Sequence, residues 1–160
     1  MSAKPAILVL GWGNLSRGDD ALGPLFVAGL QERLADELHQ QVEFLEDYQL
    51  QVEHALDLDG RRHVLFVDAS LDCPAPFLVG PVHARRDTSY TSHALSPEAL
   101  MQVFEDLHGH AAPAATLLAL RAEVFGLGEP LSALAQGNLQ AGLEWGLNWV
   151  RQAANSQVAK

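Results

Sequence analysis

Three residues of this chain, Asp20, Asp68 and His93, are of types that bind metal ions or transfer protons. Two carboxylates and an imidazole supply hard oxygen ligands and a borderline nitrogen, a set that suits zinc, nickel or a similar divalent cation. Three protein ligands leave coordination positions open for water or for a ligand from a partner. Each residue also has a simpler explanation: a helix dipole favours the acidic pair Asp19-Asp20, Asp68 ends a strand, and His93 is one of seven histidines.

The elements that must position these residues alternate between strands and helices. Short apolar runs predict strands at residues 6–10, 42–46, 63–68, 77–82 and 116–122. Amphipathic spacing and capping residues predict helices at residues 24–40, 51–58, 97–109 and 132–151, followed by a frayed tail over 152–160. This alternation implies right-handed crossovers and a mostly parallel sheet. We therefore predict one α/β domain over residues 1–160, a three-layer sandwich with about five strands and helices on both faces.

The carboxyl ends of parallel strands meet at one edge of a sheet, and open α/β folds bind their ligands there. Acidic residues follow each of the first three predicted strands: Asp19 and Asp20 after the first, Glu46 and Asp47 at the end of the second, and Asp68 at the end of the third. The fold is therefore expected to bring these carboxylates together at a single edge.

Composition narrows the classes of partner. The net charge of −10 argues against nucleic acid, whose phosphates favour basic surfaces, and is compatible with a cation or a basic peptide as ligand. No stretch resembles a secretory signal, and none approaches the roughly 20 apolar residues that a membrane span needs. The single cysteine, Cys73, excludes an internal disulfide and suits a reducing compartment, so we expect a cytoplasmic protein with no membrane partner.

A dinucleotide-binding loop is the first alternative that Gly11-Trp12-Gly13 suggests. Ser16 stands at the third glycine position, and Asp19 and Asp20 lie where a pyrophosphate would need amide groups and a positive helix end. Glu46 ends the second strand, where a ribose-binding acid would be found, so this alternative is weakened rather than excluded.

Other residues that could do chemistry have weaker patterns around them. No motif surrounds the thiol of Cys73, and no base is apparent for the hydroxyl of Ser70. His108 and His110 flank Gly109 at a predicted helix end, where the helix dipole favours histidine.

The segment from Gly11 to Gly23 resembles the N-terminal signature of the hydrogenase maturation endopeptidases. That signature is a strand, Gly-x-Gly-Asn, a short variable loop, an Asp followed by a second acid, and a glycine that opens a helix, and every part is present here. Members of this family trim the C-terminal tail of the large subunit of nickel-iron hydrogenases once nickel is installed. The resemblance covers nearly the whole chain in order and length.

The resemblance implies a site. In the family, metal-binding acids occupy the positions of Asp20 and Asp68, and a histidine in a Ser/Thr-rich loop corresponds to His93. The metal is nickel carried by the substrate or a zinc-like cation, and Asp20, Asp68 and Asp19 are the expected catalytic residues. Two schemes stay open: the metal polarises the carbonyl or activates water with Asp19 as proton acceptor, or nickel serves only for recognition and carboxylates transfer the protons.

The segment after the second strand departs from the pattern of many members, which carry a Gly-Thr loop there. The sequence from Glu46 to Glu53 resembles instead the branch that serves soluble, NAD-linked hydrogenases. Glu46, Asp47 and Gln49 are expected to bind the substrate tail. The expected partner is the nickel-loaded large-subunit precursor, and the alternative function is a non-catalytic nickel-binding checkpoint module for that subunit.

Overall fold

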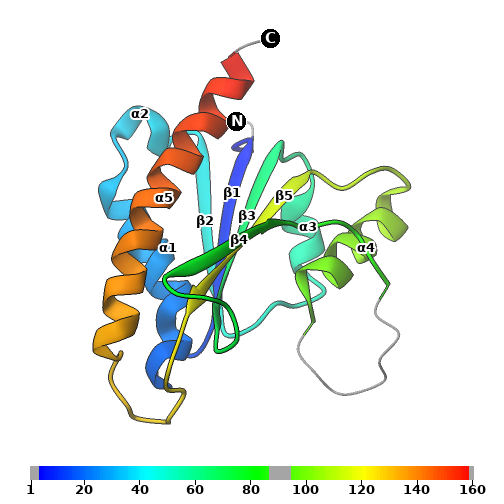
Figure 1. Cartoon of the computed structure of the whole chain (residues 1–160). Coiled ribbons are helices and arrows are strands. Elements are labelled where there is room, and N and C mark those ends of the chain that lie inside the picture. The colour runs from blue at the N-terminus through cyan, green and yellow to red at the C-terminus, as the bar shows by residue number, and fades with distance from the viewer. Residues whose placement is uncertain (1–3, 87–94, 159–160) are drawn as a thin grey trace.

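A five-stranded sheet in the order β2-β1-β3-β5-β4 forms the centre of the molecule (Figure 1). The computed structural model describes residues 4–86 and 95–158. The parallel strands are β1 (Ile7–Trp12), β2 (Val42–Asp47), β3 (His63–Ser70) and β5 (Ala114–Arg121), and β4 (Phe77–Pro81) runs antiparallel to β5 at one edge.

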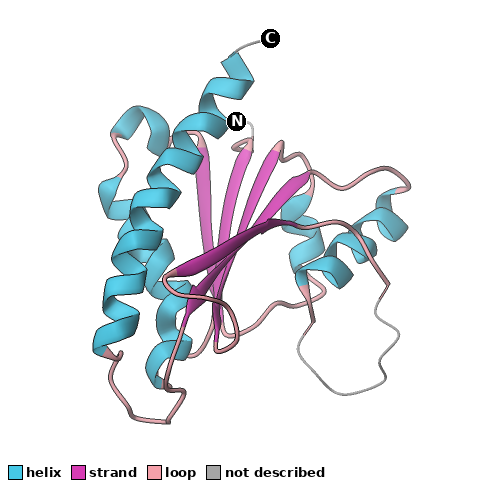
Figure 2. Ribbon diagram, in the orientation of Figure 1, coloured by secondary structure: helices cyan, strands magenta, loops and turns pink. Residues whose placement is uncertain are grey.

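Helices cover both faces of the sheet (Figure 2). One face carries α1 (Leu22–Arg33), α2 (Asp36–His39) and α5 (Ala133–Val158), and the other carries α3 (His54–Leu58) and α4 (Pro97–His108). A short 3-10 helix, η1 (Gly18–Ala21), connects the loop after β1 to α1. The predicted α/β sandwich with a mostly parallel five-stranded sheet is therefore confirmed.

Successive side chains of β1 point to opposite faces of the sheet and are apolar on both, so helices must pack against both faces. Ile7 and Val9 belong to the core beneath α1 and α5, while Leu8 and Leu10 belong to the core beneath α3 and α4. All four side chains are fully buried. A strand that is apolar on both faces is stable only between two layers of helix.

Two predicted helices differ from the observed ones. The helix predicted over residues 24–40 is interrupted, because Leu34 adopts an extended conformation between α1 and α2 and buries its side chain. The tail predicted to be frayed is helical through Val158, since Ala153 and Ala154 pack into the core and the Ser156 hydroxyl lies 2.8 Å from Nε2 of His63. No helix in the described ranges is both long enough and apolar enough to cross a membrane.

Glycines allow α1 to begin directly against the end of β1. A Cβ atom on Gly23 would lie 2.3 Å from the carbonyl oxygen of Trp12, and one on Gly11 would lie 2.5 Å from the carbonyl oxygen of Gly23. No side chain fits between these backbones, so only glycine permits the approach. This close packing holds η1 and its acidic pair at the carboxyl edge of the sheet.

Candidate active site

Asp20 and Asp68 lie at the carboxyl edge of the sheet, on different elements. Asp20 belongs to η1, and Asp68 lies in β3, in register with Ala119 of β5. The backbone amide of Asn14 donates a 3.0 Å hydrogen bond to Oδ2 of Asp20. Gly13 adopts a φ of +146°, and a Cβ atom there would lie 1.9 Å from the carbonyl oxygen of Asp20. The Gly-Asn turn after β1 therefore sets the position of the Asp20 carboxylate.

The Asp68 carboxyl group is largely buried, and it interacts electrostatically with the carboxylate of Asp20. Burial raises the pKa of Asp68 to about 7, the 2.8 Å hydrogen bond from the Ala69 amide opposes that rise, and the Asp20 carboxylate adds to it. Two carboxylates close enough to interact in this way repel each other when both are ionised. A cation bound between them would offset that repulsion, so the chemistry of the pair fits a divalent metal ion.

Asp19 is in different surroundings from its neighbour, because its side chain is fully buried. Oδ2 accepts hydrogen bonds from the amides of Glu123 (2.7 Å) and Val124 (3.1 Å), and the amide and hydroxyl of Ser132 donate to Oδ1 (2.7 Å) and Oδ2 (2.8 Å). Burial acts to raise the pKa of Asp19, but these hydrogen bonds outweigh it and hold the pKa below its ordinary value. The arrangement is that of a structural carboxylate and does not support the predicted role as proton acceptor.

A cleft opens beside Asp20, between the turn after β1 and the end of β2. Its volume is about 290 Å³, and it is lined by Gly13, Asn14, Leu15, Ser16, Pro24, Glu46, Asp47 and Tyr48. Of the predicted substrate-binding residues, Glu46 and Asp47 line this cleft, whereas Gln49 is exposed and is not part of its wall. Leu15 and Tyr48 are largely exposed, so the cleft offers apolar as well as acidic surface.

The carboxylate of Asp47 is already engaged within its own loop. It accepts a 2.7 Å hydrogen bond from the Tyr48 amide and lies 3.3 Å from Nε2 of His54. Nδ1 of His54 accepts from the Gln51 amide at 2.9 Å, which leaves Nε2 as the protonated nitrogen that faces Asp47. The Asp47 carboxylate therefore stabilises the conformation of its own loop. The Glu46 carboxylate, which also lines the cleft, is the one more available to a ligand.

His93 lies outside the described residues, so the structure brings together only two of the three predicted metal ligands. Sequence reasoning missed Asn14 and Leu15 as cleft residues, and it did not single out Tyr48 within the segment from Glu46 to Glu53. Asn14 carried a signal, since it is the last residue of the Gly-x-Gly-Asn pattern, but Leu15 and Tyr48 belong to loops whose path the sequence does not define.

The loop after β1 also bears on the dinucleotide alternative. In a dinucleotide-binding fold this turn presents free amide groups to a pyrophosphate. Here the Asn14 amide donates to the chain's own Asp20 carboxylate, and a second amide, that of Gly13, donates to the carbonyl oxygen of Asp47 at 3.0 Å. The turn is therefore closed to a phosphate group by its internal hydrogen bonds and by the adjacent negative charge.

The fold and the acidic edge define a class: a three-layer α/β protein with two interacting carboxylates at the carboxyl ends of β1 and β3. Comparison with solved structures shows that the chain shares its fold with proteins named hydrogenase maturation proteases. It is similar to the nickel-iron hydrogenase maturation protease HycI from Thermococcus kodakarensis, with 21% sequence identity, a TM-score of 0.71, and 94% of this chain and 95% of that one covered.

Two further structures from Escherichia coli show the same likeness. The hydrogenase maturating endopeptidase HybD has 24% identity and a TM-score of 0.72, covering 92% of this chain and 93% of its own. The solution structure of an endopeptidase has 23% identity and a TM-score of 0.70 over the same shares. No protein-family model and no curated protein sequence matches the chain. At these identities the likeness establishes the fold, which is that of the family that the Gly11–Gly23 segment resembles.

Proposed function

We propose that this protein is an endopeptidase that removes the C-terminal extension of a nickel-iron hydrogenase large-subunit precursor after nickel insertion. One observation carries the proposal: Asp20 and Asp68 interact at the carboxyl edge of a sheet whose fold is shared with proteins named hydrogenase maturation proteases. The Gly11–Gly23 signature supports it, because several positions of that signature have a structural role at the acidic edge. Gly13 and Asn14 position Asp20, and Gly23 allows α1 to begin at the end of β1.

The substrate's nickel is the proposed metal at this site, held by Asp20, Asp68 and His93. Carboxylate and imidazole ligands suit nickel, and a zinc-like divalent cation would accept the same donor set. The paired carboxylates of Asp20 and Asp68 fit such an ion, since they lie at one edge and their mutual repulsion is relieved by positive charge. Nickel bound by the precursor would thereby align the scissile peptide bond with this edge.

The chain's own residues would then position and activate the reacting groups. Asp68 is the better candidate to hold or release a proton, since it is recessed and has a raised pKa, whereas Asp20 is fixed by the Asn14 amide. Asp19 cannot serve in the same way, because four donors occupy its oxygens. The roles proposed for the acidic pair are therefore divided: Asp20 faces the ligand, and Asp19 holds the loop in place.

The cleft beside Asp20 is the proposed binding site of the substrate's C-terminal tail. Its lining includes Asn14, whose amide donates to Asp20, and it combines the Glu46 carboxylate with the exposed side chains of Leu15 and Tyr48. The side chains of Leu15, Glu46 and Tyr48 are exposed, so the cleft is not a buried specificity pocket, and we propose that nickel contributes more to recognition than the tail sequence does. The buried thiol of Cys73 suits a reducing compartment, and the cytoplasm is the proposed location.

Intact-mass analysis of three substrates tests this proposal. The nickel-loaded precursor, the apo precursor and a synthetic peptide across the tail junction are each incubated with the protein. Only the nickel-loaded precursor is expected to lose its extension. Asp68→Asn should abolish the mass change, whereas Glu144→Gln, which removes an exposed carboxylate on α5, should leave it intact.

The same experiment separates the alternative function. A non-catalytic checkpoint module would associate with the nickel-loaded precursor in a metal-dependent manner and leave its mass unchanged. Efficient cleavage of the peptide would instead show that the tail sequence is recognised, and would shift recognition from the metal ligands to the cleft residues Glu46 and Tyr48.

A further inference from the structure

A second group of potential metal ligands lies at the opposite edge of the sheet from Asp20 and Asp68. One ligand atom from each of Asp59, His108 and His110 lies within 4.8 Å of the other two. Asp59 lies four residues before β3 begins, and His110 lies four residues before β5 begins. The cluster is therefore at the amino-terminal ends of the strands, where the turns that follow α3 and α4 meet.

We propose that Asp59, His108 and His110 form a binding site for zinc or a similar divalent cation, separate from the candidate active site. Two imidazoles and one carboxylate are a ligand set found in zinc sites, with one position left for water or for a partner's ligand. This site does not depend on the function proposed above.

A backbone contact favours one tautomer of the His110 imidazole. Its Nδ1 lies 3.1 Å from the carbonyl oxygen of Ala111. A carbonyl oxygen can only accept, so Nδ1 carries the proton and the lone pair is on Nε2. A backbone carbonyl that accepts from one ring nitrogen while the other binds metal is the usual outer-shell arrangement of a histidine ligand.

His108 supplies a second and independent indication. Its Nε2 is buried and has no hydrogen-bond partner among the described residues. Buried polar atoms in native proteins are almost always paired, so an orphaned imidazole nitrogen requires an explanation. The ring itself is fixed by Phe104, with the ring centroids 4.3 Å apart, and the His108 and His110 centroids are 5.7 Å apart. A cation bound at this cluster would give His108 the partner that it lacks.

The end of α4 brings the two histidines together. His108 is the last residue of α4, and Gly109 then adopts a left-handed conformation with a φ of +72°. This turn reverses the chain, so His110 returns beside His108. The carboxyl end of a 12-residue helix carries partial negative charge, which favours a cation there. The helix dipole explains one histidine at this place, but it accounts for neither the nearby Asp59 nor the orphaned nitrogen.

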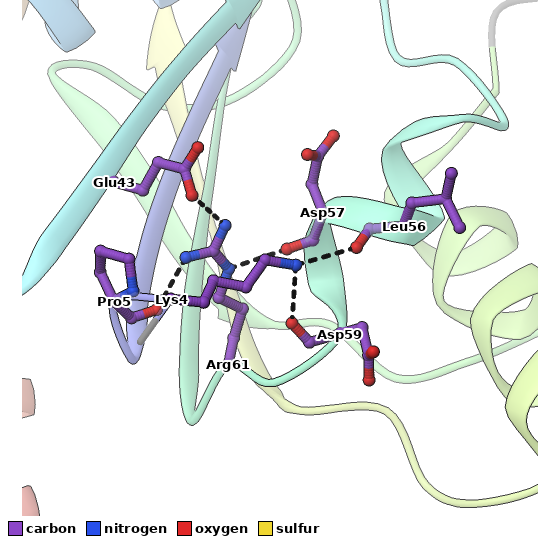
Figure 3. A network of polar contacts seen from close by, with 7 residues as sticks. All are labelled: Lys4, Pro5, Glu43, Leu56, Asp57, Asp59 and Arg61. Carbon is purple, nitrogen blue, oxygen red and sulfur yellow. Dashed lines mark hydrogen bonds and ion pairs between the residues drawn. The ribbon is translucent and has the colours of Figure 1, made fainter. Parts of the chain in front are cut away.

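The backbone that carries Asp59 is fixed by a network of polar contacts (Figure 3). The ammonium group of Lys4 donates to the carbonyl oxygens of Leu56 (3.1 Å) and Asp59 (2.9 Å). The buried Arg61 donates to the carbonyl oxygens of Asp57 (2.8 Å) and Pro5 (2.7 Å) and pairs with Glu43.

This network positions the third ligand without neutralising it. Lys4 binds the main chain of Asp59, and Figure 3 shows the Asp59 carboxylate directed away from the Lys4 ammonium group. The backbone of Asp59 is therefore fixed before any metal binds, and its carboxylate stays available. Preorganised ligands of this kind reduce the ordering cost of binding.

The spacing of the cluster is within reach of a zinc ion. Ligand atoms about 2.0–2.1 Å from a tetrahedral metal are separated from one another by about 3.3 Å. The side chains of Asp59 and His110 are exposed and can rotate to close the remaining gap, while His108 is the fixed member. Metal bound there would join the turn after α3 to the turn after α4.

Zinc titration of the chelator-treated chain tests the site. The Asp20→Asn/Asp68→Asn double variant removes the candidate active-site ligands, and we expect it still to bind one equivalent of zinc. Adding His110→Ala should weaken that binding by more than about 100-fold, since even loss of an outer-shell partner costs about 10–100-fold. Adding Asp59→Asn should also weaken it, and zinc should shift the ring signals of His108 and His110 in nuclear magnetic resonance spectra.

The control is His83→Ala, which removes an exposed histidine outside the cluster and should leave zinc binding unchanged. Melting temperatures without zinc report whether each variant is folded, and zinc should raise the melting temperature of the double variant but not that of its His110→Ala derivative. Equal zinc affinity with and without His110, or zinc-induced shifts at other histidines only, would overturn the proposal.

Discussion

The Asp19 carboxylate and Ser132, 113 positions apart in the chain, are joined by two hydrogen bonds, of 2.7 Å from the Ser132 amide and 2.8 Å from its hydroxyl. Together with the amides of Glu123 and Val124, these donors attach the loop after β5 to the acidic turn after β1. The fully buried side chain of Asp19 thus holds in place the segment from which Asp20 reaches the candidate site.

Asp19→Asn should lower the free energy of unfolding by about 3 kcal/mol or more, because an amide group would face buried donors and lose charge-assisted hydrogen bonds. Urea unfolding measures the change. Ser132→Ala should cost about 1–2 kcal/mol, since it removes one of these bonds and the cap that the Ser132 hydroxyl provides for the Ala135 amide. If Asp19→Asn is as stable as the parent but fails to bind nickel, Asp19 belongs to the metal site instead.

Asp68→Asn should abolish processing of the precursor without lowering stability. The substitution keeps the shape of the side chain and removes a recessed negative charge that faces Asp20. Paired measurements of product mass and of the urea midpoint distinguish loss of a functional group from loss of the fold. Asp20→Asn should likewise lose processing, and retention of full activity by both variants would contradict the assignment of the site.

Gly13→Ala should disrupt the site through the backbone. The added Cβ would lie 1.9 Å from the Asp20 carbonyl oxygen, at a φ that disfavours any side chain. We expect a loss of at least about 2 kcal/mol together with loss of nickel binding. Gly137→Ala is the matched control: it lies within α5 with open space around its Cα, so alanine there should stabilise the protein by about 0.5–1 kcal/mol. Thermal unfolding and nickel titration report both effects.

Tyr48→Ala should affect substrate binding more than turnover. The Tyr48 side chain is 72% exposed and lines the cleft beside Asp20, but it makes no contact with the two carboxylates that would act on the scissile bond. Steady-state processing of nickel-loaded precursor should show a rise in KM with kcat nearly unchanged. Leu107→Ala, on the exposed side of α4, removes a similarly exposed apolar side chain away from the cleft and should change neither constant.

Sequence patterns predicted the strands well because β1 and β3, which lie inside the sheet, are nearly continuous runs of apolar residues that are buried on both faces. The apolar run from Ile7 to Leu10 and the glycines after it determine where β1 ends, and hence where Asp20 lies. The interruption of the first long helix was not predictable, since Leu34 continues the apolar spacing of a helix while its backbone is extended. Nor was the length of α5, because alanines at 153 and 154 give little hydrophobic signal before the fold shows that they are buried.

The meeting of Asp20 and Asp68 at the carboxyl edge of the sheet was predictable, but the different surroundings of Asp19 and Asp20 were not. Asp19 and Asp20 are identical neighbours, and only the path of the chain shows that one faces inward toward Ser132 while the other accepts from Asn14. The cluster of Asp59 with His108 and His110 was also beyond sequence reasoning, because it depends on the meeting of two turns that are distant in the chain.

The strand order has a consequence for synthesis. In β2-β1-β3-β5-β4, the first three strands to leave the ribosome are neighbours in the finished sheet, so they can assemble around β1 as soon as β3 has emerged. The next strand, β4, pairs only with β5, which is translated later and inserts between β3 and β4. The nascent chain therefore carries the edge of β3 and the apolar residues of β4 without partners until β5 appears, and this interval is when it most needs protection from aggregation.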